Sequence, residues 1–343
     1  MKRSAAFLLL ITLMAALITR PVLAYSPSPL TVQLNGTVVN APADINIVEG
    51  QVMIPLRWAA ELLGNNTVQW DPATRTITIE TKQDFYSLEK LAAYTSALQH
   101  SSDDRDGSVW PLPDRVKNLH LSNLVPSREW VLELPQKMNQ FSSSQTPQSI
   151  TIRIVSEDGL YEHSSVVYSA ENRQGHYYLP MDWLEYLFKA KVQYNETTNV
   201  LFIQTPDLEK INSEIALIEN TLIPASADEA IKLWGRGEQT RNGALQYAAL
   251  SPELRQVANK SDYVRQTYWV TGYSSPWVGP ITIINRNKLS ETKIEYILSF
   301  PEMTSAPPYT TATEKLIVEK LSNNGQEGWF ITQIQQSSGY GII

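Results

Sequence analysis

The sequence contains no cysteine. This absence excludes disulfide bridges, thiol nucleophiles, thiolate metal sites and a lipid anchor attached to cysteine. A chain without disulfides must be held together by packing alone. A hydrophobic content of 43% with nine Trp is ample for packed cores, and 343 residues are enough for two or three domains.

Histidine is also scarce. Only His100, His120, His163 and His176 are present, and no two of them lie at metal-ligand spacing on one expected element. A Cu(II) site favours clustered imidazoles, so we expect neither copper nor any other cofactor. The glycine and catalytic motifs of nucleotide-binding proteins, zinc proteases and serine hydrolases are absent too. The sequence therefore names no catalytic residue and favours a protein that is not an enzyme.

Positive charge is the third shortage. The chain has 28 Lys and Arg against 35 Asp and Glu, which gives a formal net charge of −7. Binding to a phosphate backbone needs clustered Lys and Arg. We therefore expect no nucleic-acid partner.

The N-terminus has the composition of an export signal. Lys2 and Arg3 precede a charge-free apolar run of fifteen residues, Ala5 to Thr19, and Val22 and Ala24 supply small residues for cleavage. This run is shorter than the ~20 residues that span a bilayer. Residues 1–24 are expected to be a signal peptide that is removed, with an uncleaved anchor as the alternative. The mature chain would be extracellular or associated with the cell envelope.

An internal repeat dominates the first two thirds of the chain. Residues 50–79 have the pattern of a strand, a proline, an amphipathic helix, a turn and a hairpin, and residues 175–203 repeat it. The repeat predicts two copies of one small α+β module, stabilised by matched core positions. These pairs are Pro55 and Pro180, Trp58 and Trp183, Leu62 and Leu187, and Trp70 and Tyr194.

The run I-P-L-R-W-A-A-E-L-L-G, followed by V-Q-W-D, resembles the copper amine oxidase N-terminal-like module, or stalk domain, of secreted bacterial proteins. The second copy departs from this pattern, with Asp182 in place of the Arg and Lys189 in place of the Gly. In true amine oxidases the copper lies in a separate catalytic domain rich in His, which this chain lacks. The resemblance implies a copper-free structural module in an exported protein of Gram-positive type.

Asn35-Gly36 is a hairpin turn signal. Helical spacing predicts a helix at 84–98, and alternation predicts a strand at 128–134. Ser226 and Glu229 have the pattern of a capping box that opens a helix.

The last third is expected to be helical to about residue 264 and rich in strands afterwards, with strands at 268–271 and 277–286 among them. This order is typical of a cone-shaped α+β fold, and it resembles the nuclear transport factor 2-like family. The overall fold class is therefore α+β. The expected units are a first module at 25–82, a helical and irregular connector at 83–147 that could add strands to the second module, a second module at 148–206, a linker helix at 207–223, a C-terminal domain at 224–337 and a tail at 338–343.

Aromatic residues and one arginine are the candidate ligand-binding residues of the C-terminal domain: Trp234, Arg241, Tyr247, Trp269, Trp277 and Trp329. Arg241 could hold a carboxylate or an anionic wall polymer at the mouth of the cone. The alternative is that the aromatics form core and that residues 239–243 form a simple turn. The acidic loop at 102–109 resembles a calcium loop but has Pro113 where the final Glu ligand belongs, so we interpret it as a solvated turn.

Three functions are compatible with these observations. The favoured hypothesis is a non-enzymatic binding or scaffolding protein of the cell envelope, whose partner is a wall polymer, a peptide or an envelope protein. The second is a hydrolase or isomerase with its site in the C-terminal cone, which requires a buried carboxylate with a raised pKa. The third is a signalling or inhibitory ectodomain, which requires an exposed apolar patch.

Overall fold

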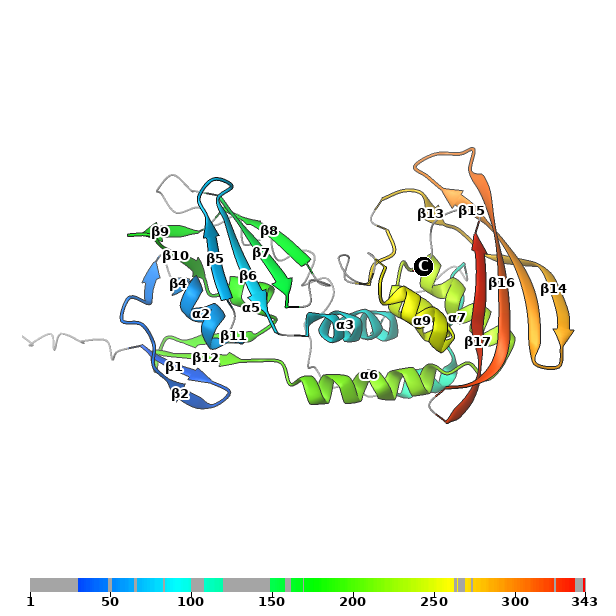
Figure 1. Cartoon of the computed structure of the whole chain (residues 1–343), viewed down its shortest axis with the longest axis horizontal. Helices are drawn as coiled ribbons and strands as arrows, with labels where there is room; N and C mark the ends of the chain where they lie inside the picture. The colour runs from blue at the N-terminus through cyan, green and yellow to red at the C-terminus, as the bar shows by residue number, and fades with distance from the viewer. Residues whose placement is uncertain are drawn as a thin grey trace, which may run out of the picture.

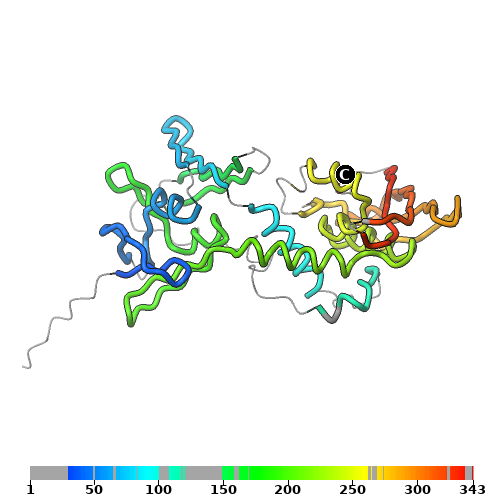
Figure 2. Tube along the Cα trace, turned by 60° about the horizontal axis from the view of Figure 1, so that its bottom comes forward, coloured from blue at the N-terminus to red at the C-terminus, as the bar shows by residue number. Residues whose placement is uncertain are grey.

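The computed structural model describes residues 30–48, 51–64, 67–82, 84–99, 108–119, 149–157, 162–168, 170–261, 264, 269–272, 274–323, 325–336 and 342. The expected signal peptide, most of the acidic loop, the strand expected at 128–134, His100 and His120 lie outside these residues. The fold is mixed α+β, as predicted. An N-terminal lobe of small sheets is separated by two helices from a C-terminal body with a long curved sheet (Figure 1, Figure 2).

The N-terminal lobe consists of two series of elements in the same order: four strands, one helix and two strands. The first series is β1 (Thr31–Leu34), β2 (Thr37–Val39), β3 (Asn46–Val48), β4 (Gln51–Pro55), α2 (Leu56–Leu62), β5 (Thr67–Asp71) and β6 (Thr76–Thr81). The second is β7 (Ile150–Ser156), β8 (Glu162–Val167), β9 (Glu171–Arg173), β10 (His176–Pro180), α5 (Asp182–Phe188), β11 (Lys191–Asn195) and β12 (Val200–Gln204).

The two series interleave. The lobe has three four-stranded sheets, with orders β11-β12-β1-β2, β3-β4-β10-β9 and β5-β6-β7-β8, so each sheet contains strands of both series. Strand β1 is parallel to β12, β6 is parallel to β7, and β4 is antiparallel to β10. Strands this short bury little surface by themselves, so they pair across the repeat. The sequence predicts two modules that follow one another along the chain. In the structure, strand pairing between the two modules joins them side by side.

Local signals set several element ends. Asn35 and Gly36 both have positive φ, 50° and 82°, and connect β1 to antiparallel β2, which confirms the predicted hairpin turn. Pro55 is the last residue of β4 and the N-cap of α2, one position before the place that the sequence suggested. Helix α5 ends at Lys189, which has the left-handed φ of 54° usually taken by glycine.

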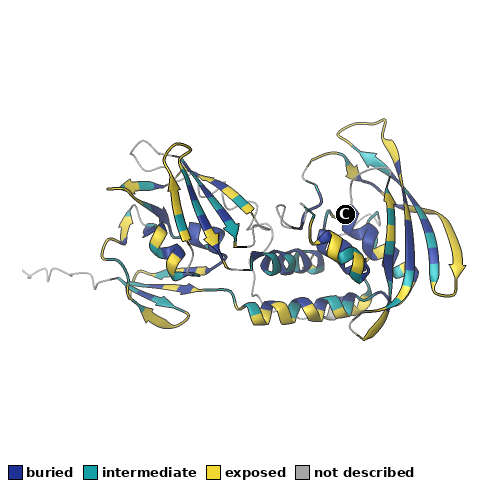
Figure 3. Ribbon diagram, in the orientation of Figure 1, coloured by how far each residue is buried: buried dark blue, intermediate teal, exposed yellow. Residues whose placement is uncertain are grey.

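Helices α3 (Phe85–Gln99) and α6 (Leu208–Leu222) contact each other, and both contact helix α8 of the C-terminal body. Their bounds lie within a residue of those predicted. The buried residues of α6 form one stripe, Ile211, Ile215, Ile218 and Leu222. The expected linker helix is therefore solvated on one face and packed on the other (Figure 3).

The C-terminal body has helices before strands, as expected. Its elements are α7 (Ala227–Gln239), α8 (Gly243–Ala249), α9 (Pro252–Ala258), β13 (Trp277–Val278), β14 (Thr282–Ser290), β15 (Lys293–Met303), β16 (Thr310–Asn323) and β17 (Gln326–Gln336). The strands form an antiparallel sheet of order β13-β15-β16-β17, with β14 also paired to β15. The helices pack against one face of this sheet.

Two sequence expectations for this body change in detail. The strand expected near residue 270 is a turn in which Val270 makes an isolated bridge to Asn242. The strand expected from Trp277 is divided into β13 and β14. The predicted capping box of α7 is confirmed, because Oγ of Ser226 accepts the amide of Glu229 at 3.2 Å.

Residues 108–119 of the connector pack on α6 and the C-terminal body. Its short 3-10 helix η1 (Asp114–Asn118) contacts α6, and Leu112 and Val116 are buried. The ring of Trp110 lies so close to Gly235 that a Cβ atom at Gly235 would be 2.6 Å from it. In the described part of the chain, no helix is long and apolar enough to cross a membrane.

Candidate functional site

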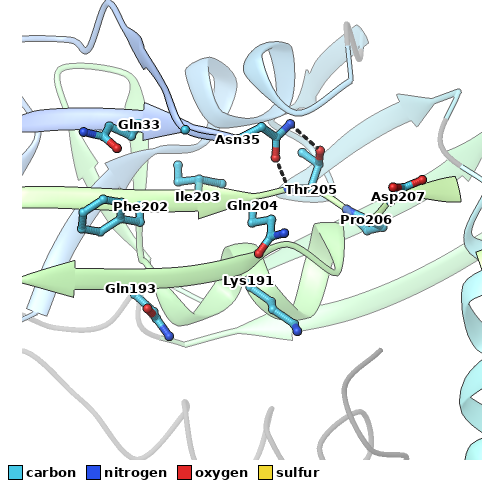
Figure 4. A pocket seen from close by; sticks show the side chains of 11 residues that line it. Gln33, Asn35, Lys191, Gln193, Phe202, Ile203, Gln204, Thr205, Pro206 and Asp207 are labelled. Atoms are coloured by element: carbon cyan, nitrogen blue, oxygen red, sulfur yellow. Dashed lines mark hydrogen bonds between the residues drawn. The ribbon is translucent and has the colours of Figure 1, made fainter. Parts of the chain in front are cut away.

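An open groove of about 580 Å³ lies on one face of the sheet β11-β12-β1-β2 (Figure 4). Strand register explains which side chains share this face, since residues alternate between the two faces of a sheet. Gln193 of β11 pairs with Phe202 of β12, which pairs with Gln33 of β1. Lys191 pairs with Gln204 in the row alongside. The groove is thus built by strands from both series.

One border of the groove is fixed by a reciprocal pair of hydrogen bonds. The Asn35 side-chain amide donates to Oγ1 of Thr205 at 2.9 Å and accepts the Thr205 backbone amide at 3.0 Å (Figure 4). Beyond Thr205, Asp207 caps α6 by accepting the amide of Lys210, which lowers the pKa of Asp207. These contacts hold the end of β12 and the β1 turn in a fixed relation.

The groove is polar without a dominant charge. The ring of Phe202, 40% exposed, lies toward one end of the groove, with glutamine side chains beside it on the same and neighbouring strands (Figure 4). Side-chain amides both donate and accept hydrogen bonds. One cation, Lys191, and one anion, Asp207, border the groove. The surface therefore suits an uncharged, hydroxyl- or amide-bearing ligand that also has an apolar face.

Sequence reasoning had placed the candidate binding residues in the C-terminal body. Two of them, Tyr247 and Trp269, do lie together, with ring centroids 5.3 Å apart in an edge arrangement. The space in front of them is occupied by the chain itself. Nζ of Lys90, from α3, lies 3.8 Å from the centroid of Tyr247 and 5.1 Å from that of Trp269. These aromatics therefore bind α3 through cation–π contacts.

Lys90 is also part of a buried charge network. It forms an ion pair of 2.5 Å with Glu219 of α6, which accepts a hydrogen bond of 3.1 Å from the hydroxyl of Tyr94. Arg255 of α9 lies 3.8 Å from the same carboxylate. Burial lowers the pKa of Lys90, and the Glu219 charge offsets part of that shift. The network joins α3 to α6 and α9.

Arg241 and Trp277 form a second group. The Arg241 guanidinium donates to the carbonyls of Gly272, Ser274 and Pro276, and its carbon lies 4.9 Å from the centroid of Trp277. The arginine that the sequence placed at a ligand-binding mouth thus stabilises the segment before β13. Trp329, on β17, is partly buried, and its amide donates to Pro224 at 3.0 Å.

Trp234 belongs to a third group that contains a carboxyl pair. The Trp234 indole donates to Glu314 of β16 at 2.9 Å, and Gln336 donates to the other oxygen at 2.8 Å. Burial raises the pKa of Glu314 to about 7. Burial and the neighbouring Glu314 raise the pKa of Glu238 well above its usual value. The two carboxyls are 2% and 1% exposed, Glu238 and Glu314 respectively.

The sequence analysis did not single out this pair, although a signal existed. Glu238 follows Trp234 by four residues on α7, so both lie on the same helix face. Glu314 alternates on β16 with the buried Ala312 and Leu316. Both positions are predicted by spacing to point inward. The six predicted binding residues are thus distributed over separate places, each contacting other parts of the chain.

The repeat positions differ in burial. Pro55, Pro180, Trp183 and Leu187 are buried, whereas Trp58, Leu62 and Tyr194 are partly buried. Trp70 is 38% exposed and packs at 4.9 Å on Tyr177 of the other series. Trp58, Leu62 and Tyr194 pack against the core from partly buried positions, whereas Trp70 is exposed. Figure 1 gives the reason: α5 lies on the side facing α3, whereas α2 lies on the outer side.

The surroundings of His163 bear on whether the protein could bind a metal ion. Nε2 of His163 lies 2.8 Å from both Oγ of Ser165 and the hydroxyl of Tyr186. Burial, with the charge of Lys189, lowers the pKa of His163 to about 3, so the ring stays neutral in a structural network. In the described part of the chain, no three His, Cys, Asp or Glu side chains lie close enough together to hold a metal ion.

Residues 33–89 match the family of copper amine oxidase N-terminal domains. The match covers the first series from β1 to β6 and the start of α3. The matched segment contains neither His nor Cys, so its residues do not fit a copper site. Neither a curated protein nor a solved structure matches the chain.

Proposed function

We propose that the protein is an exported binding or scaffolding protein of the cell envelope. The family match supports a stalk module in the first series, and the identical order of elements supports a second module in residues 150–204. Helices followed by a curved antiparallel sheet support a nuclear transport factor 2-like fold for the C-terminal body. The N-terminal sequence supports export.

The observation that carries a binding role is the groove on the sheet β11-β12-β1-β2. Its strands come from both modules, so a single module could not form it. Pairing two modules thus creates a surface for a ligand, on a scaffold whose strands fix the side chains. The cation–π contacts around Lys90 hold α3, and with it the C-terminal body, in a defined position relative to that surface.

Export and attachment can be tested together. The full chain with a C-terminal tag is expressed in a Gram-positive host, and the purified chain from residue 25 is mixed with isolated envelopes. We expect the tagged protein outside the cytosol with its N-terminal segment removed, and saturable sedimentation of the purified protein with envelopes. Tagged protein confined to the cytosol, or no sedimentation, would reject the proposal.

The enzyme hypothesis keeps one specific observation in its favour. Glu238 and Glu314 form a buried carboxyl pair with raised pKa values, which is a common property of acid catalysts. Turnover of chromogenic esters, amides and glycosides would be measured for the purified protein and for Glu314→Gln. A rate that falls at least roughly a hundredfold in the variant, with the fold intact, would favour an enzyme. Equal rates in both proteins would exclude this role for the pair.

A further inference from the structure

The groove continues past Phe202. A second hollow of about 590 Å³ is lined by Gln193, Tyr194, Asn195, Glu196 and Phe202. It shares Gln193 and Phe202 with the groove of about 580 Å³ described above. Phe202 therefore stands between two adjoining spaces along β11 and β12. A ligand with several repeating units would fit this arrangement better than a single small molecule.

The exposure of Phe202 provides an apolar platform. Burying a Phe side chain is worth about 1.5–3 kcal/mol, yet this ring keeps 40% of its surface exposed in the middle of a sheet face. The face of an aromatic ring carries partial negative charge. It therefore attracts the weakly positive C–H groups on the flat side of a pyranose ring.

The polar groups select for hydroxyls. Gln33, Gln193 and Gln204 come from three adjacent strands, which are ~4.8 Å apart. Each amide can donate and accept at once, and so can each sugar hydroxyl. Lys191 and Asp207 border the groove and the second hollow adds the carboxylate of Glu196, so the surface does not favour a phosphate or another anion.

The sheet topology argues against a peptide. Peptides that bind to sheets usually add a strand to a free edge, through backbone hydrogen bonds. Strand β11 is an edge of this sheet, but Phe202, Gln204 and Gln33 lie on the interior strands β12 and β1, whose backbone groups are used in ladders with neighbours on both sides. Recognition in the groove must therefore use side chains, which is how sugar rings are bound.

Taking the proposed binding function as its basis, we propose that this surface binds a neutral polysaccharide chain, with pyranose units on both sides of Phe202. The Phe202 ring stacks on one sugar, and the glutamine amides bind the hydroxyls of that sugar and its neighbours. Asn35 and Thr205 hold the border of the groove and take no direct part.

The test is calorimetric titration of the purified chain with chitohexaose, cellohexaose and maltohexaose. We expect at least one hexasaccharide to bind, its monosaccharide to bind at least roughly tenfold more weakly, and Phe202→Ala to weaken binding about tenfold, which equals 1.4 kcal/mol. Gln204→Ala should weaken it severalfold. The matched control is Tyr309→Ala, because Tyr309 is exposed to the same extent, 41%, but lies in the C-terminal body.

Three outcomes would overturn the inference: no hexasaccharide binds at millimolar concentration, Phe202→Ala binds as tightly as the wild type, or oligogalacturonate binds more tightly than every neutral probe and loses affinity in Lys191→Met. Sedimentation with envelopes separates this inference from the proposed function. If envelopes bind the wild type but no hexasaccharide does, the proposed envelope function is retained and polysaccharide binding in the groove is rejected. If a hexasaccharide binds but envelopes do not, the groove stands and envelope attachment fails.

Discussion

At the scale of single residues, Glu314 makes folding stability depend on pH. Its pKa is about 7 in the folded protein, against a usual value of 4.5, because it is buried. Below pH 4.5 the Glu314 carboxyl is protonated in both the folded and the unfolded protein, so its burial does not lower folding stability there. As the pH rises from 4.5 to 7, the unfolded chain releases the proton and the folded protein retains it. Folding stability therefore falls by roughly 3 kcal/mol across this window and then levels off.

We predict that Glu238→Gln/Glu314→Gln removes this part of the pH dependence. Both carboxyls have raised pKa values, so both act in the same direction. Urea unfolding should show that, between pH 5 and pH 7.5, the wild type loses at least roughly 2 kcal/mol more stability than the variant. Comparing the two proteins at each pH cancels the opposite contribution of His163, whose pKa is lowered.

The control for this measurement is Glu319→Gln. Glu319 lies on the same strand, and its pKa is lowered by its hydrogen bond from Lys293. Its contribution is present above its unfolded pKa and is lost only toward acid, so it should leave the comparison between pH 5 and 7.5 unchanged. An unchanged pH dependence in the double variant would contradict the buried, protonated pair.

Among the elements, α3 has the most unusual position. Adjacent residues of this helix serve the two halves of the molecule. Nζ of Lys90 lies over the ring of Tyr247 in the C-terminal body, whereas the charge of Glu89 acts on Lys189 at the end of α5, in the N-terminal lobe. The amide of Asn242 also donates to the Ala93 carbonyl at 2.8 Å. Helix α3 is therefore fixed by polar contacts as well as by packing.

We predict that Lys90→Met destabilises the protein by about 3 kcal/mol. Methionine keeps the apolar stem but leaves the buried Glu219 with a weaker partner, Arg255 at 3.8 Å, and breaking a buried pair costs about 3–5 kcal/mol. Urea unfolding measures the change, and hydrogen exchange should show faster exchange in α3. The exposed Lys232→Met should change stability by less than about 0.5 kcal/mol. Equal effects of the two variants would refute the role of the ion pair.

A second element-scale prediction concerns the contact between the connector and α7. In Gly235→Ala the new Cβ would meet the Trp110 ring at 2.6 Å, so the connector must shift, at a cost of about 1–3 kcal/mol. In a Trp110→Leu background the cost should be smaller, because the close contact that remains is Cδ1 of Ile281 at 2.9 Å, the end of a flexible side chain, and alanine favours helix by about 1 kcal/mol over glycine. Thermal or urea unfolding of the four proteins measures this coupling. Additive effects would show that the ring does not restrict residue 235.

For the whole molecule, the interleaved lobe means that neither series has a sheet of its own. Residues 30–99 contain β1, β4 and β6 without their partners β12, β10 and β7. We predict that a fragment of residues 30–99 is unfolded, and that adding residues 149–343 restores structure. Circular dichroism and amide NMR dispersion measure both states. A folded, dispersed spectrum from residues 30–99 alone would contradict the shared sheets.

Much of the fold was predictable where the information is local. The hairpin at Asn35-Gly36 and the capping box at Ser226 depend on neighbouring residues, and both were predicted from the sequence. Strand partners are distant in the sequence, so the hydrophobic periodicity of β1 and of β12 does not indicate that these two strands pair. The predicted binding residues do not come together in one site, for a related reason. Lysine is mostly exposed in proteins, and nothing near Lys90 indicates that distant aromatic rings surround it.

The parallel pairing of β1 with β12 also determines when the N-terminal lobe can fold during synthesis. During synthesis β1 emerges first in the lobe, and its partner emerges last, after residue 199. The first sheet therefore cannot close until almost the whole lobe has been made, and the long loop between the two strands makes this pairing slow. We therefore expect the first series to lack stable structure until then. A chain that stays open for so long is one that can be threaded through a narrow channel before it folds.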